Sequence, residues 1–170
     1  MPKNLKIIGV VILTINLIVA INLLATKTFQ NAQASQLQQS LQESQILELV
    51  NLERSKNGIE PLTINPQLTQ SAQLKTRDML DRNYFEHISN GGQKWSDFII
   101  KSGYNYTTSG ENLAKNYTDS RSTVQAWMNS PTHRDNILNK NFRETGIGFG
   151  SGLIDGQNTI LITQQFGSQP

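Results

Sequence analysis

The sequence predicts an α+β domain, because apolar residues with helical spacing alternate along the chain with a few glycine-rich segments of strand-like spacing. The strand pattern is clearest from Thr145, where Ile147 and Phe149 fall on one face and glycines fall on the other. A strand face lined by glycine lets another element approach the backbone closely. Beyond a leader of about 34 residues, the chain is long enough for one domain with its own hydrophobic core.

The first 26 residues have the composition of a signal peptide or a membrane anchor. Lys3 and Lys6 precede an apolar run over residues 7–25. The small-residue triplet Ala32-Gln33-Ala34 favours a cleaved signal peptide, whereas the 19-residue run is about long enough to cross a bilayer. Both interpretations predict an extracytoplasmic domain, either secreted or tethered to the membrane. Residues 27–44 are predicted to be a polar, Gln-rich linker that becomes helical toward its end, and residues 45–170 the domain.

Composition excludes several kinds of site. The chain has no cysteine, which rules out disulfides and thiolate metal sites. From Ser35 onward there are 12 basic and 13 acidic residues, a net charge of −1. A near-neutral domain without basic clusters has no electrostatic footprint for nucleic acid, so no nucleic-acid partner is expected.

Helices are predicted where an apolar stripe follows a start signal. One helix runs from Ser44 to Asn57-Gly58, and after a loop over 59–64 a second begins at Asn65-Pro66. The other predicted elements are a short helix over 95–100, an edge strand over 104–108, a helix capped by Ser120 or Ser122, and a last strand over 159–166.

The stretch over residues 126–150 joins a helix to the glycine-rich strand. Ser130-Pro131 is typical of a helix start, with the serine oxygen accepting an early backbone N–H. His133 then falls in the first turn, where unpaired N–H groups and the helix dipole disfavour an imidazolium. We therefore expect His133 to be mostly neutral near pH 7.

Several other residues are predicted to have structural roles. Asn51 and Arg54 are expected to tie the first helix to its neighbours, and residues 134–136 to form a hydrogen-bonding cluster. The large aromatic residues are expected in the core: Trp95, Trp127, Phe142 and Phe149.

A set of short motifs appears in a fixed order along the chain: Val50-Asn51-x-x-Arg54, Tyr84-Phe85-x-His87, Gly110-Glu111-Asn112-Leu113, Trp127-x-x-Ser130-Pro131-x-His133-Arg134-x-Asn136-Ile137-Leu138 and Gly146-x-Gly148. Together they resemble a bacterial CAP domain, of the SCP-like family related to cysteine-rich secretory proteins, antigen 5 and plant pathogenesis-related proteins. The resemblance covers about residues 45–166. It implies an α-β-α sandwich with a central antiparallel sheet between helical layers and a central cleft.

The resemblance also implies a cleft that carries two histidines and two acidic residues. By position these are His87, His133 and Glu111, whereas Ser130 stands where animal relatives place the second acid. The cleft residues are thus predicted to be His87, Glu111, Ser130 and His133. The missing carboxylate puts any activity assigned to the full set in doubt. Ser130 is not expected to be a nucleophile, because no strained Gly-x-Ser-x-Gly turn surrounds it.

Three functions follow as expectations. The first is a binding module for a lipid, a small apolar molecule or a cell-envelope component, because lipid binding occurs in the family. The second is a divalent-metal-dependent hydrolase, in which His87 and His133, with Glu111, hold Zn²⁺ or another divalent cation, and His133 or Glu111 activates water. The third is a structural surface adhesin. The alternative for the histidines is a structural role that holds helices to the sheet.

Overall fold

The computed structural model describes residues 3–170, with the side chains of residues 1–19, 37, 40 and 41 left out of the description. The chain divides into two units, Met1–Ser40 and Leu41–Pro170. Among the described residues no helix carries a stretch both apolar and long enough to cross a membrane. Most of the apolar run over 7–25 belongs to residues whose side chains lie outside the description, so its role as signal peptide or anchor stays a prediction.

A single helix, α1 (Lys3–Lys56), contains the predicted polar linker. Residues 27–44 are helical throughout, which corrects the expectation that only their end is helical. Ala, Gln and Leu are good helix formers, and no Gly or Pro interrupts the segment. The helix ends where predicted, since Gly58 follows it with a φ of 66°, a left-handed conformation that favours glycine.

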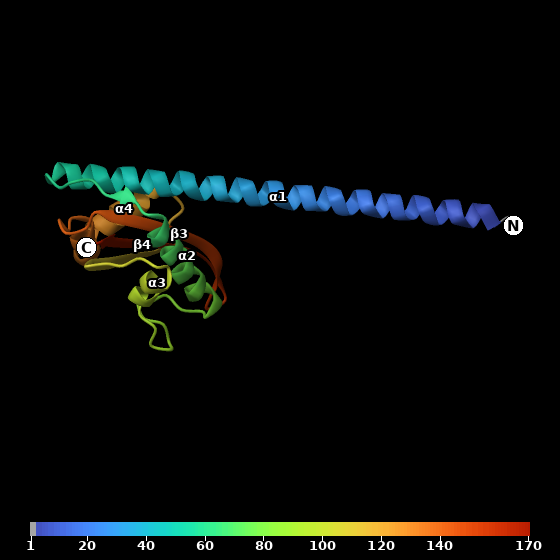
Figure 1. Ribbon diagram of the computed structural model, residues 1–170. Helices are drawn as coiled ribbons and strands as arrows, with labels where there is room; N and C mark the ends of the chain where they lie inside the picture. Colours follow the sequence, from blue (N-terminus) through green and yellow to red (C-terminus); the bar gives the residue numbers. More distant parts are fainter. Residues whose placement is uncertain (1–2) are drawn as a thin grey trace. The chain divides into compact units, whose positions relative to one another are not determined.

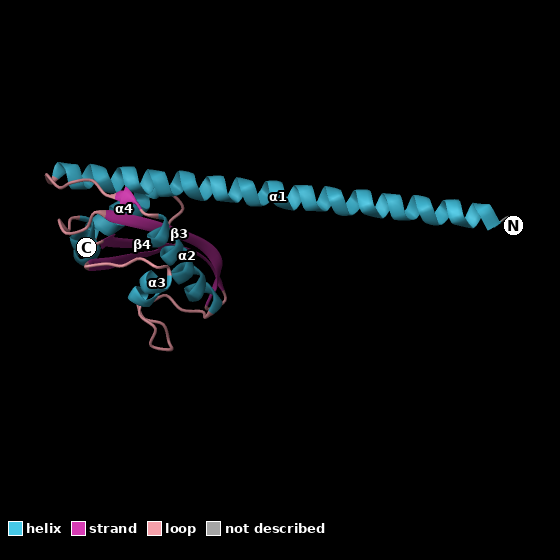
Figure 2. Ribbon diagram, in the orientation of Figure 1, coloured by secondary structure: helices cyan, strands magenta, loops and turns pink. Residues whose placement is uncertain are grey.

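The unit of residues 41–170 is built on a four-stranded sheet, drawn in magenta in Figure 2. Its strands are β1 (Thr63–Ile64), β2 (Thr108–Lys115), β3 (Glu144–Ile154) and β4 (Gln157–Ser168), in the order β1-β3-β4-β2. The three long strands are antiparallel, as predicted, and the two-residue β1 adds to β3 in parallel. This arrangement makes β2 an edge strand.

The edge strand lies later in the sequence than predicted. Residues 104–107 precede it, and the ring of Tyr104 is buried against Leu68 and Ile99 instead of standing on a strand. Backbone pairing with β4 begins at Thr107, whose N–H donates to Ser168 O, and continues through the Gly110–Ala114 motif. The buried polar residues of that motif break the apolar alternation by which strands are recognised.

Helix α2 (Pro66–Asp81) covers the glycine face of β3. The side chain of Asn65 caps it, accepting from the N–H groups of Gln67 and Leu68. A Cβ added to Gly148 would lie 2.4 Å from the backbone carbon of Ala72, so the helix backbone rests directly on the strand. This confirms the close approach that the glycine pattern predicts. The short helix α3 (Trp95–Lys101), also predicted, packs with α2 on this side (Figure 1).

The opposite face carries the larger core. Helices α4 (Ser120–Asn129) and α5 (Pro131–Ile137) pack there together with the C-terminal part of α1 (Figure 1). Asp119 caps α4, one residue before the predicted Ser120, because its carboxylate accepts from the Ser122 N–H. The apolar side chains that meet between these helices and the sheet include Ile46, Val50, Trp127, Ile137, Phe142, Ile147, Ile162 and Phe166.

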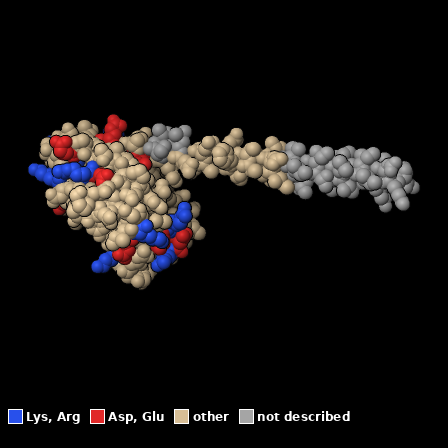
Figure 3. Space-filling model, viewed as in Figure 1, with Lys and Arg blue, Asp and Glu red and all other residues tan. Residues whose placement is uncertain are grey.

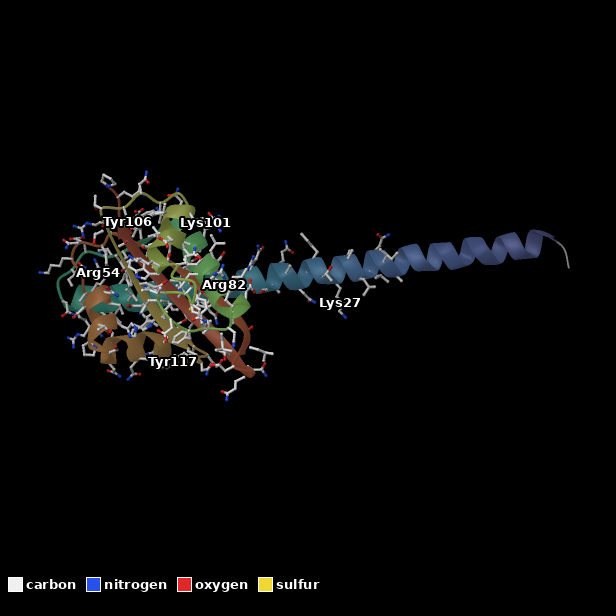
Figure 4. The ribbon with its side chains drawn as sticks, turned by 90° about the horizontal axis from the view of Figure 1, so that it is seen from below. Lys27, Arg54, Arg82, Lys101, Tyr106 and Tyr117 are labelled. Carbon is white, nitrogen blue, oxygen red and sulfur yellow. The ribbon has the colours of Figure 1, made fainter. Side chains whose placement is uncertain are left out.

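The predicted roles of Asn51 and Arg54 are confirmed. Asn51 exchanges two hydrogen bonds with the backbone of Leu62. The fully buried Arg54 lies within this unit (Figure 4) and donates to four backbone carbonyls. On the face of this unit seen in Figure 3, basic and acidic side chains lie beside each other.

Candidate functional site

The site is built on β2, whose neighbouring residues point to opposite layers of the sandwich. Glu111 pairs with Gln165 of β4 and faces α2, whereas Asn112 faces α5. Because β2 is the edge strand, side chains from both layers can meet beside it. His87, in the segment after α2, and His133, on α5, approach this edge from the two layers.

Glu111 and His87 form the centre of the site. The imidazole Nδ1 of His87 lies 2.8 Å from Oε1 of Glu111, and Nε2 of Gln165 donates to Oε2 at 3.2 Å. The side chain of Glu111 is fully buried, whereas that of His87 is 47% exposed. Burial raises the pKa of Glu111, while the hydrogen bond from His87, the charge of Lys75 and the bond from Gln165 act in the opposite direction. The buried carboxylate of Glu111 thus hydrogen-bonds to an imidazole that is about half exposed.

His133 is positioned by a polar network on the other layer. Asn112 Nδ2 donates to the His133 carbonyl at 3.1 Å, and Asn136 Nδ2 donates to Asn112 Oδ1 at 2.9 Å. Asn136 also donates to the Glu111 carbonyl at 3.1 Å. The expected hydrogen-bonding cluster over residues 134–136 is thus confirmed for Asn136, which fixes α5 against β2 beside Glu111.

The pKa of His133 is lowered, as expected, but chiefly by a different cause. Burial has the larger effect, and the charge of His87 adds to it. His133 is therefore neutral near pH 7, and its ring can accept a hydrogen bond.

We predict that His133 titrates below its ordinary value of 6.5, and that His87→Ala moves this pKa upward by removing the second cause. Because the folded-state pKa lies below the unfolded one, the unfolded chain takes up the proton first. The contribution of His133 to stability is therefore present above the unfolded pKa and is lost as pH falls through the folded pKa. NMR titration of the His133 imidazole measures its pKa in the wild type and in His87→Ala. A His133 pKa at or above the ordinary value would contradict the prediction.

Ser130 occupies the N-cap position of α5, as predicted, but not with the predicted hydrogen bond. Its φ and ψ are extended, and its side chain caps no backbone N–H. Its Oγ lies 3.5 Å from Oγ1 of Thr132, at the limit of a hydrogen bond. Pro131 at the first helical position and the Ser130 backbone thus start the helix. Among the side-chain hydrogen bonds of the described residues, none joins Ser130 to Glu111 or to either histidine.

The predicted three-residue metal set is not formed. Both carboxylate oxygens of Glu111 are engaged by protein donors, Oε1 by His87 and Oε2 by Gln165. Among the described side chains, no group of three or more His, Asp and Glu residues is arranged to hold a metal ion. Two imidazoles fall short of the three protein ligands of a catalytic zinc site, so the residues present do not fit the metal that the resemblance implies.

Two residues of the site were missed at the sequence level. Gln165 gives no signal in the sequence, because only strand pairing brings it to Glu111. Lys75 does give one: it continues the buried stripe of Leu68, Ala72 and Met79 on α2, where a lysine is out of place.

Comparisons with known proteins agree with this architecture. The family model of the cysteine-rich secretory protein (CAP) family matches residues 47–165. The protein YkwD of Bacillus subtilis (strain 168) is 44% identical over 127 residues, which are 75% of this chain and 47% of the relative. The membrane protein YlbC of the same organism is 34% identical over 110 residues, 65% of this chain and 32% of the relative. The chain thus spans less than half the length of each of these two relatives.

A solved structure shows the same fold. It is an extracellular protein containing an SCP domain from Bacillus anthracis str. Ames, with a TM-score of 0.64 and 31% identity, covering 76% of this chain and 41% of that one. The ordered motifs, the layered sheet and the matched family model agree, and the chain belongs to the CAP, or cysteine-rich secretory protein, family.

Proposed function

We propose that the CAP domain of this chain is an extracytoplasmic binding module for a polar component of the cell envelope, held by His87 and His133. One observation carries the proposal: a fully buried carboxylate, Glu111, orients an imidazole, that of His87, which is about half exposed. Burying a carboxylate costs free energy. A histidine that only fills space would not need such a partner, so the pair indicates a role for the imidazole.

The hydrogen-bond pattern supports the kind of ligand. A carboxylate at Glu111 accepts the Nδ1 proton of His87, which leaves Nε2 of that ring as an acceptor. The lowered pKa of His133 makes its ring a second neutral imidazole. Ring nitrogens that accept hydrogen bonds suit a ligand with hydroxyl or amide N–H donors better than an anion. Glycan hydroxyl groups and peptide amides of the cell wall have these donors.

One partly apolar hollow of the domain lies away from the two histidines. A hollow of about 350 Å³ between α1 and α4 is lined by Leu49, Leu52, Val124 and Met128, together with four polar or charged residues. It shares no residue with the histidine site. A lipid chain would find apolar lining in this hollow, whereas the polar histidine site suits a polar ligand.

Location outside the cytoplasm is supported by the leader and by a relative. Lys3 and Lys6 before an apolar run are typical of a segment that directs export. The Bacillus anthracis protein of similar fold is described as extracellular. An extracytoplasmic domain would face the cell wall directly.

The test is a calorimetric titration of the full chain with a soluble peptidoglycan fragment, a disaccharide that carries its stem peptide. We expect one-site binding that is weakened at least tenfold, or about 1.4 kcal/mol, by His87→Ala and by His133→Ala. Thr132→Ala is the matched control, because Thr132 is exposed and lies beside His133 on α5. It should bind like the wild type.

Two results would overturn the proposal. One is a folded wild type that binds vesicles of phosphatidylglycerol but not the fragment, which would favour the lipid alternative. The other is fragment binding that survives both histidine substitutions, which would place the ligand elsewhere. The hydrolase and adhesin alternatives stay predictions, and no step through a metal ion is derived because the ligand set does not fit.

A further inference from the structure

Lys75 is a fully buried lysine in the middle of α2. Its Nζ donates to the hydroxyl of Tyr84 at 3.0 Å and to the carbonyl of Glu86 at 2.8 Å. It also lies 4.7 Å from the centre of the Tyr84 ring and 5.7 Å from that of Phe98. A buried ammonium is costly unless its environment compensates it, so these contacts call for an explanation beyond packing.

Both hydrogen-bond acceptors belong to the short segment that ends in His87. Glu86 is the residue before His87, and its carbonyl is held directly by the ammonium. Tyr84 is held from two sides, because it accepts from Lys75 and donates to Oδ2 of Asp78 at 2.5 Å. Lys75 therefore fastens the segment over residues 84–87 to α2 immediately before the imidazole.

The charge of the ammonium also acts on the buried acid of the site. The acidic groups whose charges act on Lys75 are Glu111, Asp78 and Glu86, and they oppose the lowering of its pKa by burial. Asp78 already has a cation of its own, since Arg82 Nε lies 3.0 Å from its Oδ1. Glu111 is fully buried, and the charge of Lys75 favours its ionised form.

We propose that Lys75 is a positioning residue, whose ammonium holds the His87 segment against α2 and keeps Glu111 available as the acceptor for Nδ1 of His87. Its importance for binding rests on the proposed function of His87. The expected effect of Lys75 on the His87 imidazole is independent of that function, because the hydrogen bond between His87 and Glu111 can be observed without any ligand.

The experiment reads the tautomer of His87 by NMR in the full chain labelled with ¹⁵N-histidine. The chain has only two histidines, so the spectrum is simple to assign with His133→Ala. At about pH 8, where imidazoles are neutral, we expect the Nδ1–H form of His87 in the wild type. Lys75→Met keeps the length of the side chain but removes the ammonium. We expect it to shift His87 toward the Nε2–H form that a free histidine prefers.

Lys115→Met is the matched control. The Nζ of Lys115 lies 5.1 Å from the centre of the Phe85 ring, so it touches the same segment without holding its backbone. This variant should leave the tautomer of His87 unchanged. A Lys75→Met variant that is folded and keeps the wild-type tautomer would overturn the proposal.

A chemical rescue separates the ammonium from packing. Because the chain has no cysteine, Lys75→Cys can be alkylated with bromoethylamine under denaturing conditions at that position alone and then refolded. The product carries an ammonium on a side chain of lysine length. Restoration of the wild-type His87 tautomer supports the role of the ammonium, and a folded product without restoration refutes it. If Lys75→Met does not fold, the His87 tautomer in the alkylated Lys75→Cys protein is compared with that in the unalkylated one, and this comparison tests the proposal.

Discussion

Gly146→Ala is expected to destabilise the domain by about 4 kcal/mol or more, a loss at the upper end of single substitutions. A Cβ added at Gly146 would lie 2.0 Å from the backbone N of Thr69 and 2.2 Å from the backbone carbon of Leu68. Backbone atoms cannot turn aside as the end of a side chain can. The first turn of α2 would have to lift off the sheet, which would also disturb the cap at Asn65.

Gly152→Ala is the matched control on the same face of β3. Its added Cβ would meet only the side chain of Leu80, at 3.2 Å, and Leu80 can adjust. We expect a loss of less than about 1 kcal/mol for this variant. Urea unfolding followed by circular dichroism measures both changes. Equal midpoints for the two variants would show that α2 does not rest on the strand backbone at Gly146.

Arg54→Met is expected to cost about 3–5 kcal/mol, because it orphans several buried acceptors at once. Nε of Arg54 donates to Glu60 O at 2.8 Å, Nη1 donates to Ile137 O at 2.8 Å and to Asn139 O at 2.9 Å, and Nη2 donates to Phe142 O at 3.0 Å. One guanidinium thus satisfies the end of α5, the loop after it and the loop after α1. Methionine fills much of the same volume but donates to none of these carbonyls.

Arg54→Lys tests whether stability depends on the planar guanidinium of Arg54, and Arg82→Met is the control at an exposed arginine. Arg54→Lys keeps the charge but not the spread of donors, so we expect a loss nearly as large as that of Arg54→Met. Arg82→Met removes an arginine whose side chain is 54% exposed and pairs with Asp78. Its loss should be below about 1 kcal/mol. Denaturation midpoints for Arg54→Met within the range of Arg82→Met would contradict the assigned role.

The parts of the fold with local signals were predictable from the sequence. Asn65-Pro66 marks the start of α2 because cap and proline act within a few residues, and the structure shows that cap. The glycines of β3 predicted a close approach, although not that α2 makes it. The ordered motifs placed His87, Glu111 and His133 in one domain through their resemblance to a family, not through any local rule.

One error, the position of β2, arose because contacts between residues distant in the sequence decided the outcome. Strand β2 was placed too early because Glu111 and Asn112 look like loop residues. Their burial is tolerated only because Gln165 and Asn136, distant in sequence, supply hydrogen bonds. For the predicted metal set, spacing also says nothing of Gln165, which donates to the second carboxylate oxygen of Glu111. Among the described residues no group of three His, Asp and Glu is arranged to hold a metal ion.

The two histidines belong to opposite layers of the sandwich, so the packing of each layer against β2 determines where its histidine lies. Lys75 of α2 holds the carbonyl of Glu86, the residue before His87, and Asn112 of β2 holds the carbonyl of His133 on α5. On the α5 side of β2, Gly110 leaves so little room that an added Cβ would meet the Phe142 ring at 2.8 Å. A larger residue at Gly110 would therefore displace Phe142 or Asn136, and Asn136 belongs to the network that holds α5, and His133 with it, against β2. The affinity of the proposed histidine site for its ligand is then expected to depend on packing in the core as well as on the two rings.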